Sequence, residues 1–235
     1  MEHTHIVKSF GQDLSQIDNL ILKMGGLVEN QIIESVNALN DRHVELAEKV
    51  RADDKAVDAL EVEIDESALR ILALRQPMAQ DLRNVTSALK IASNLERIGD
   101  YAKNIAKRTI VIAENDAVGS SEKTIKRMGL LVQKMVNDVL NAYINRDVES
   151  ATEIIARDED VDHVHNTLFR ELLTYMMEDP RNITSCMHML FIAKNIERMG
   201  DHTTAVAEQI HYLVTGSLPE QERIKGDTTA ELPAG

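Results

Sequence analysis

The chain has few of the residues that interrupt or terminate helices. Among its 235 residues there are four prolines, ten glycines, no tryptophan and only 3% aromatic residues. This composition favours long helices whose cores are built from Leu, Ile, Val, Met and Ala. With 43% apolar residues, the chain can bury one or two such cores.

Two further absences narrow the class of protein. A single cysteine, Cys186, excludes an internal disulfide framework, and its apolar helical surroundings indicate a buried, inert thiol. The chain contains no run of 18 apolar residues, and its first residues lack the basic-then-apolar pattern of a signal peptide. We therefore expect a soluble, cytoplasmic protein.

Basic residues are in the minority, with 26 Lys and Arg against 39 Asp and Glu, which gives a net charge of −13. An acidic surface repels phosphate backbones, and no basic stripe with interleaved aromatic residues is present, so we expect no nucleic-acid partner. The acidity fits cation binding or basic protein partners better. The sequence shows neither a paired nucleophile and base nor a glycine-rich phosphate loop, so it does not predict an enzyme.

The chain repeats itself. The segment Asn94–Asp100 reads N-L-E-R-I-G-D and returns at Asn195–Asp201 as N-I-E-R-M-G-D. Earlier in each half, Met24-Gly25 aligns with Met128-Gly129. Self-similarity of this kind predicts an internal duplication.

Apolar residues at helical spacing predict six long helices, at about residues 12–40, 44–75, 77–113, 121–144, 148–177 and 180–214. Turn and cap signals separate or end them, namely Asn40-Asp41, Pro77, Asp179-Pro180 and Gly216. Combined with the repeat, this pattern predicts an all-α fold of two tandem, pseudo-symmetric three-helix bundles. We assign residues 10–116 to the first bundle, 120–215 to the second and 217–235 to a flexible tail.

Each copy of the repeated motif carries two acids one helical turn apart: Glu96 and Asp100 in the first copy, Glu197 and Asp201 in the second. These acids lie largely away from the apolar stripe, so we expect them to point outward. Like charges at this spacing repel by a few tenths of a kcal/mol. A single pair is more often a solvated surface feature, but its recurrence favours a shared role. Lys103 can relieve Asp100, whereas the matching position in the second copy is Thr204.

A second set of acids lies four residues apart on the second and fifth helices: Asp54 and Asp58, and Asp158 and Asp162. They flank the apolar stripe, so each repeat can bring four carboxylates into one groove. Such a cluster needs a cation, a proton or a basic side chain, and oxygen ligands favour hard ions such as Mg²⁺, Mn²⁺ or iron. We predict that these eight acids bind metal. Three nearby histidines would favour iron or zinc in the second site, although each alone is more often a surface residue: His163, His165 and His202.

With these residues in view, the chain resembles the PhoU family of phosphate-signalling regulators. The resemblance covers roughly residues 10–215 and rests on Glu96–Asp100, Glu197–Asp201, Arg75-Gln76-Pro77, Asp81-Leu82-Arg83 and Leu173–Asp179. It implies two three-helix repeats whose E/D-x-x-x-D motif pairs bind metal. Asn182 stands near where Asp81 would align, so a ligand role for Asp81 is not repeated.

The resemblance also implies regulation. Members of the family are cytoplasmic and often dimeric, and they meet the inner face of the membrane only through partners. They couple the ATPase subunit of the phosphate ABC transporter to a membrane sensor histidine kinase. By this resemblance, the chain is expected to keep the phosphate-starvation response off and to restrain phosphate uptake when phosphate is plentiful. Composition and residue spacing do not show any of this.

Two alternatives stay open. A carboxylate-bridged di-metal enzyme of the ferritin-like class would need paired Glu-x-x-His motifs in a four-helix bundle. The chain offers only Glu208-x-x-His211 and Asp162-x-x-His165, which are not symmetric partners. The other alternative is a metal-free helical adaptor whose acids bind basic partners.

Overall fold

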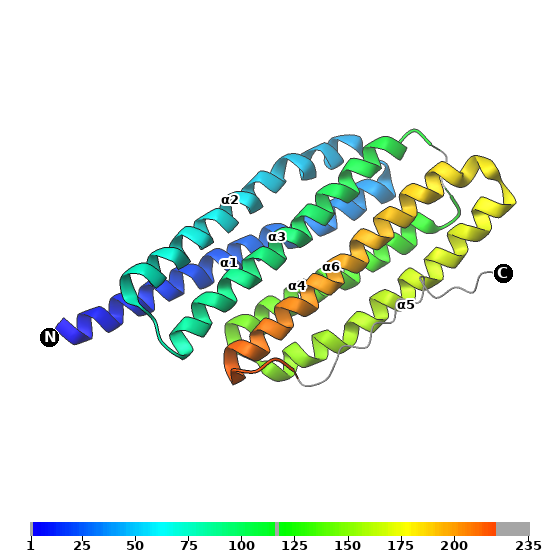
Figure 1. Cartoon of the computed structure of the whole chain (residues 1–235). Helices are drawn as coiled ribbons and strands as arrows, with labels where there is room; N and C mark the ends of the chain where they lie inside the picture. Colours follow the sequence, from blue (N-terminus) through cyan, green and yellow to red (C-terminus); the bar gives the residue numbers. More distant parts are fainter. Residues whose placement is uncertain (1, 116–117, 220–235) are drawn as a thin grey trace.

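The computed structural model describes residues 2–115 and 118–219, and within these ranges the chain is almost entirely helical (Figure 1). The elements are α1 (Glu2–Asp41), α2 (Val44–Arg75), α3 (Gln80–Ile112), α4 (Ser121–Asn145), α5 (Val148–Glu178), a 3-10 turn η1 (Pro180–Asn182) and α6 (Ile183–Thr215). The predicted all-α fold of six long helices is confirmed. None of the helices in the described ranges is long and apolar enough to cross a membrane. Most of the predicted tail, from residue 220 on, lies outside these ranges.

Several helix ends fall where the sequence signals place them. α2 ends at Arg75, before Pro77, and Gln76 takes a left-handed conformation with φ 48°. At the other end of the chain, α6 is closed by Gly216 with φ 83°. The Asp179 side chain accepts a hydrogen bond from the Arg181 backbone, so it caps η1, which leads into α6.

Two helix starts differ from the prediction. α1 begins at Glu2, about ten residues early, because the segment before Gln12 contains no proline to stop it even though it lacks apolar periodicity. α3 begins at Gln80 rather than at Pro77, because Ala79 has a positive φ of 48° that no α-helix accepts.

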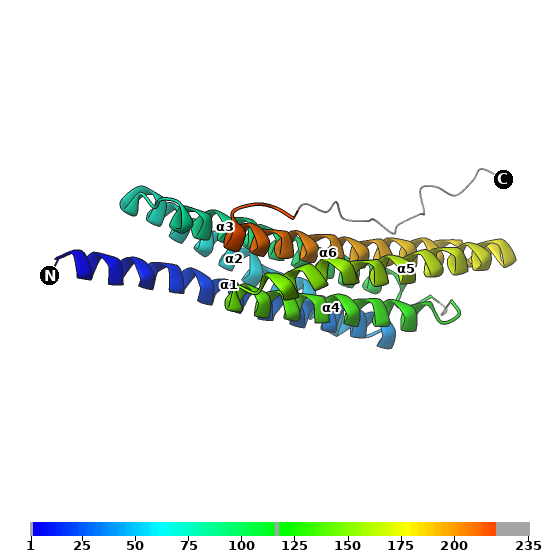
Figure 2. The ribbon, with the colours of Figure 1, turned by 90° about the horizontal axis from the view of Figure 1, so that it is seen from below.

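The helices form two layers (Figure 2). In one layer they lie side by side in the order α2, α3, α6, α5, and α1 and α4 pack beneath them. Within each repeat the three helices all contact one another, and the two repeats meet where α3 packs on α6 and α1 packs on α4. The chain therefore forms two three-helix bundles placed side by side, as predicted.

The apolar core is continuous across both bundles. Buried residues such as Ile21 on α1, Ile98 on α3, Ile125 on α4 and Ile196 on α6 belong to one cluster. The boundaries 10–116 and 120–215 stay predictions, but the two repeats do not have separate cores.

The contact between α1 and α4 shows the internal symmetry at the level of side chains. A Cβ atom added to Gly25 would lie 2.3 Å from Leu140, and one added to Gly129 would lie 2.5 Å from Val36. Residues 25 and 129 are matching positions, and so are 36 and 140. Each glycine thus lets the other repeat's first helix approach closely.

A second reciprocal contact joins the ends of the same two helices. Arg42 follows α1 and binds Glu122 of α4 at 2.8 Å, while Arg146 follows α4 and lies 3.5 Å from Asp18 of α1. Both arginines take a positive φ, 52° and 54°. Arg146 also stacks on Tyr143, whose hydroxyl donates a hydrogen bond to Asp18. The relative position of the repeats is therefore held by ion pairs at both ends of the α1–α4 contact.

Candidate functional site

The eight predicted site acids lie on the four helices of the larger layer, but they are not equally accessible. The four buried ones are Asp54, Asp158, Asp162 and Glu197. The three half-buried ones are Glu96, Asp100 and Asp201, and the exposed one is Asp58. The expectation that the motif acids point outward is wrong for Glu197, which is 5% exposed. Glu197 lies on a part of α6 that neighbouring helices cover, whereas the matching Glu96 on α3 is half-buried.

The glycine of each motif explains how the acids of the preceding helix come close. A Cβ atom on Gly200 would lie 2.4 Å from Oδ1 of Asp158. On Gly99 it would lie 2.9 Å from Oε1 of Gln31 and 3.6 Å from Oδ1 of Asp54. The glycine of the E-R-x-G-D motif therefore leaves space that the Asp158 carboxylate occupies beside α6 and that the Gln31 side chain occupies beside α3.

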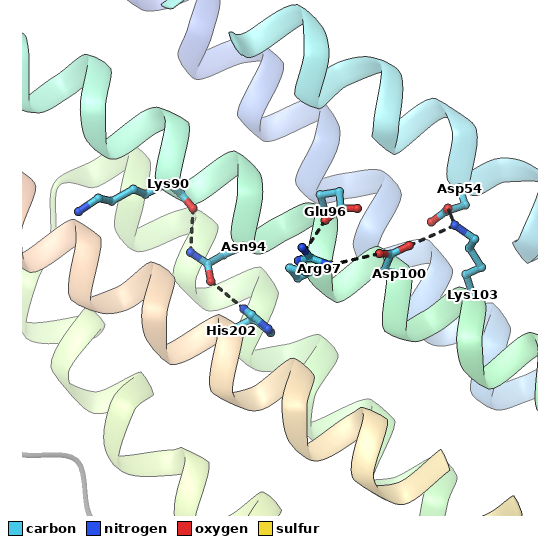
Figure 3. A network of polar contacts seen from close by, with 8 residues as sticks. All are labelled: Asp54, Lys90, Asn94, Glu96, Arg97, Asp100, Lys103 and His202. Carbon is cyan, nitrogen blue, oxygen red and sulfur yellow. Dashed lines mark hydrogen bonds and ion pairs between the residues drawn. The ribbon is translucent and has the colours of Figure 1, made fainter. Parts of the chain in front are cut away.

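In the first repeat the buried aspartate is bound by protein groups (Figure 3). The Lys103 ammonium lies 2.6 Å from Oδ2 of Asp54 and 3.1 Å from Oδ1 of Asp100. The Gln31 amide donates to Oδ1 of Asp54 at 3.5 Å. Hydrogen bonding to Asp54 raises the pKa of Lys103. The predicted contact between Lys103 and Asp100 is confirmed, and the stronger contact across to α2 was not foreseen.

The outer part of the first site carries one further cation. Arg97 lies 3.7 Å from Glu96 and 3.8 Å from Asp100 (Figure 3). Burial, together with the negative charges of Asp100 and Glu61, raises the pKa of Glu96 to about 7. Burial also raises the pKa of Asp58. These carboxyls therefore hold protons more readily than free ones do.

In the second repeat the motif glutamate lies deeper. The Lys194 ammonium lies 2.9 Å from Oε1 of Glu197, at the spacing that the sequence indicated. Burial raises the pKa of Glu197; Lys194 opposes this effect, and the charge of Asp201 adds to it. The neutral form of this carboxyl is therefore favoured relative to a free glutamate.

The position that matches Lys103 brings no charge to the second site. Thr204 is buried there, and its hydroxyl donates to the backbone carbonyl of Asp201. Of the two histidines predicted near this site on α5, His165 is buried and His163 is exposed. The two copies of the motif therefore share a backbone arrangement but differ in charge and polarity.

A polar contact joins the two motifs where α3 crosses α6 (Figure 3). The Nδ1 atom of His202 lies 2.8 Å from the Asn94 side-chain oxygen, and its ring lies 5.7 Å from that of Tyr101. A hydrogen bond with Tyr101 raises the pKa of Arg198, while burial lowers that of His202. Tyr101 and His202 are matching positions, a signal in the sequence from which their contact could have been inferred.

The arrangement of the first site does not fit a metal ion, since the Lys103 ammonium lies between Asp54 and Asp100, where an ion bridging these two carboxylates would lie. Across the described residues, no group of three or more His, Cys, Asp or Glu side chains is arranged so that it could hold a metal ion. Metal binding by the second set, Asp158, Asp162, Glu197 and Asp201, stays a prediction.

Comparisons with known proteins agree with the arrangement of repeats. The family model described as PhoU domain matches residues 21–109 and 125–210. Proteins named phosphate-specific transport system accessory protein PhoU homolog are similar along nearly their whole length. One from Caulobacter vibrioides is 47% identical, with 97% of this chain and 99% of that protein covered. One from Rhizobium meliloti is 46% identical, with 99% of this chain and 98% of that protein covered.

Two solved structures are also similar. The crystal structure of PhoU from Pseudomonas aeruginosa matches with a TM-score of 0.85 at 41% identity, covering 88% of this chain and 100% of that one. The phosphate transport system regulatory protein PhoU from Streptococcus pneumoniae matches with a TM-score of 0.83 at 30% identity, covering 90% and 100%. Because the family model matches most of its length in two copies, this chain belongs to the PhoU family.

Proposed function

We propose that this chain is a cytoplasmic accessory regulator of a phosphate-specific transport system, which keeps the phosphate-starvation response off and restrains uptake when phosphate is plentiful. The observation that carries the proposal is the 47% identity, over 97% of this chain, to a relative named as such an accessory protein. In this proposal the chain carries no catalytic activity. It acts by contacting the ATPase subunit of the transporter and a sensor histidine kinase, and it does so as a homodimer.

The structure limits which acids can form the contact surface. Buried carboxylates such as Asp54 and Glu197 cannot reach a partner while the bundle is intact. Asp58, Asp100 and Asp201 keep exposed or partly exposed side chains on the layer formed by α2, α3, α6 and α5. We propose that these accessible acids contact basic surfaces of the partners, because opposite charges speed association and select partners.

The regulatory role is tested with a phosphatase reporter of the phosphate-starvation response, in a bacterial strain from which the gene is deleted. In high phosphate the deletion strain should express the reporter constitutively, and this gene should silence it again. Reporter expression that stays high with normal levels of this protein would contradict the proposed role.

The contact surface is tested in the same strain with the double variant Asp100→Ala and Asp201→Ala. We expect reporter silencing to be largely lost while the protein still folds, as judged by circular dichroism. The control is Glu45→Ala with Glu149→Ala, two exposed acids at matching positions in the first turns of α2 and α5, which should silence normally. Full silencing by the Asp100 and Asp201 variant would show that these acids are not the working surface.

A further inference from the structure

We infer that the Lys103 ammonium takes the place of a metal ion in the first repeat, so that α2 and α3 are joined there by a charge that the chain itself supplies. Lys103 lies between one carboxylate of each helix, Asp54 of α2 and Asp100 of α3. This is the position at which a bridging cation would be shared by the two predicted acid pairs.

The distances leave no room for a second cation. The ammonium nitrogen lies 2.6 Å from Asp54 and 3.1 Å from Asp100, while a bound Mg²⁺ or Ca²⁺ would lie about 2.0–2.6 Å from the same oxygens. A metal ion there would overlap the ammonium and be repelled by its charge. The remaining oxygen of Asp54 accepts from Gln31. Each oxygen of the most buried carboxylate of the site therefore already has a partner within the chain.

Burial makes this counter-charge necessary. The Asp54 side chain is only 3% exposed, and an ionised carboxylate without a partner at such a site is strongly destabilising. The Lys103 side chain is 40% exposed, so its stem can lie along the helices while the ammonium bends inward. A lysine ammonium is a compact point charge, which suits a position shared by two carboxylates.

The lysine at this position of the motif helix is not repeated. At the matching position the second repeat has Thr204, a buried neutral residue that donates to its own helix backbone. A side chain at this position therefore neutralises Asp54 of α2 in the first repeat, whereas the matching side chain brings no charge to Asp158 of α5. This inference goes beyond the regulatory proposal and does not depend on it, because it concerns only how the first repeat is held together.

The first experiment compares thermal unfolding of the full chain in excess chelator. Lys103→Met should lower the Tm by about 5 °C because Asp54 loses its counter-charge. Adding Asp54→Asn to that variant should restore most of the loss, since the unpaired charge is then gone. The matched control is Lys107→Met, an exposed lysine one turn further along α3, which should melt with the wild type. A Lys103→Met variant that melts like the control would overturn the inference.

The second experiment needs no Lys103 variant to fold. Bound Mn²⁺ is counted by the loss of its free-ion electron paramagnetic resonance signal, in wild type and in Asp54→Asn. We expect the same number of ions per chain in both proteins, because Asp54 takes no part in metal binding. Fewer bound ions in Asp54→Asn would show that a metal ion does occupy the first repeat, and the inference would be wrong.

Discussion

The contact between α1 and α4 and the contact between α3 and α6 both relate one repeat to the other, but they have kept the duplication to different degrees. In the first, Gly25 and Gly129 perform the same task for each other's repeat. In the second, Tyr101 of α3 corresponds to His202 of α6, and the two different rings lie 5.7 Å apart. Where a side chain packs directly on the backbone of another helix, only a small residue fits, so both copies have glycine at this position. A polar cluster needs only overall balance of charge, which different residues can supply.

The same contrast appears inside the motif itself. Both copies of E-R-x-G-D have a glycine with a buried side chain close beside it, the Asp158 carboxylate at Gly200 and the Gln31 amide at Gly99. The cations stand at different positions of the motif helices: Lys103 contacts Asp54 of α2 and Asp100 of its own helix, and Lys194 contacts Glu197. We conclude that both copies of the motif share their backbone arrangement, whereas the charged residues that neutralise its acids differ between the repeats.

The largest effect is expected where the two motif glycines are changed to alanine. In Gly200→Ala the new methyl group meets the buried Asp158 carboxylate at 2.4 Å, so the variant should lose about 2 kcal/mol of unfolding free energy. Gly99→Ala meets mainly the end of the flexible Gln31 side chain and should lose less than about half as much. Urea unfolding measures both.

The control for the glycine series is Gly26→Ala. A methyl group there meets nothing within 4 Å, and alanine favours a helix interior by up to about 1 kcal/mol, so this variant should be slightly stabilised. Equal losses for Gly200→Ala and Gly99→Ala would mean that the two motifs are packed alike after all.

A smaller difference is expected between the two reciprocal ion pairs. Arg42→Ala leaves the mostly buried Glu122 carboxylate without its guanidinium and should cost about 1.5 kcal/mol. Arg146→Ala should cost about half of that, because Asp18 keeps its hydrogen bond from Tyr143. Chemical unfolding of the two variants under the same conditions tests the order, and a larger loss for Arg146→Ala would reverse the interpretation.

The smallest effect concerns pH and another position at which the repeats differ, His188 against Ser87. Burial, with Arg108 adding, lowers the pKa of His188. Below pH ~6.5 the unfolded chain therefore binds a proton more readily than the folded chain, and stability falls as pH falls. Between about pH 7.5 and pH 5.5, the unfolding free energy of wild type should fall more than that of His188→Ser, and the difference should be below about 1 kcal/mol. Parallel pH profiles would contradict this.

The sequence predicted the helices, the duplication and the positions of both acid pairs. It could do so because apolar spacing, prolines and caps act within a few residues, and because the repeat is visible as identical residues such as Glu96 and Glu197. The α3 start at Gln80 was missed, since a backbone angle at Ala79 sets it and no residue type there announces it.

Burial and partners could not be predicted in the same way. Asp54 and Asp58 are one turn apart on one helix, yet the first is buried and the second is exposed. A helical pattern distinguishes faces of its own helix, but it does not say how many neighbours surround that helix. Glu197 is buried and the matching Glu96 is half-buried, although α6 and α3 each pack against three long helices. Lys103 reaches Asp54 because α3 packs on α2. Such contacts join residues far apart in the chain, so they exist only once the bundles have assembled.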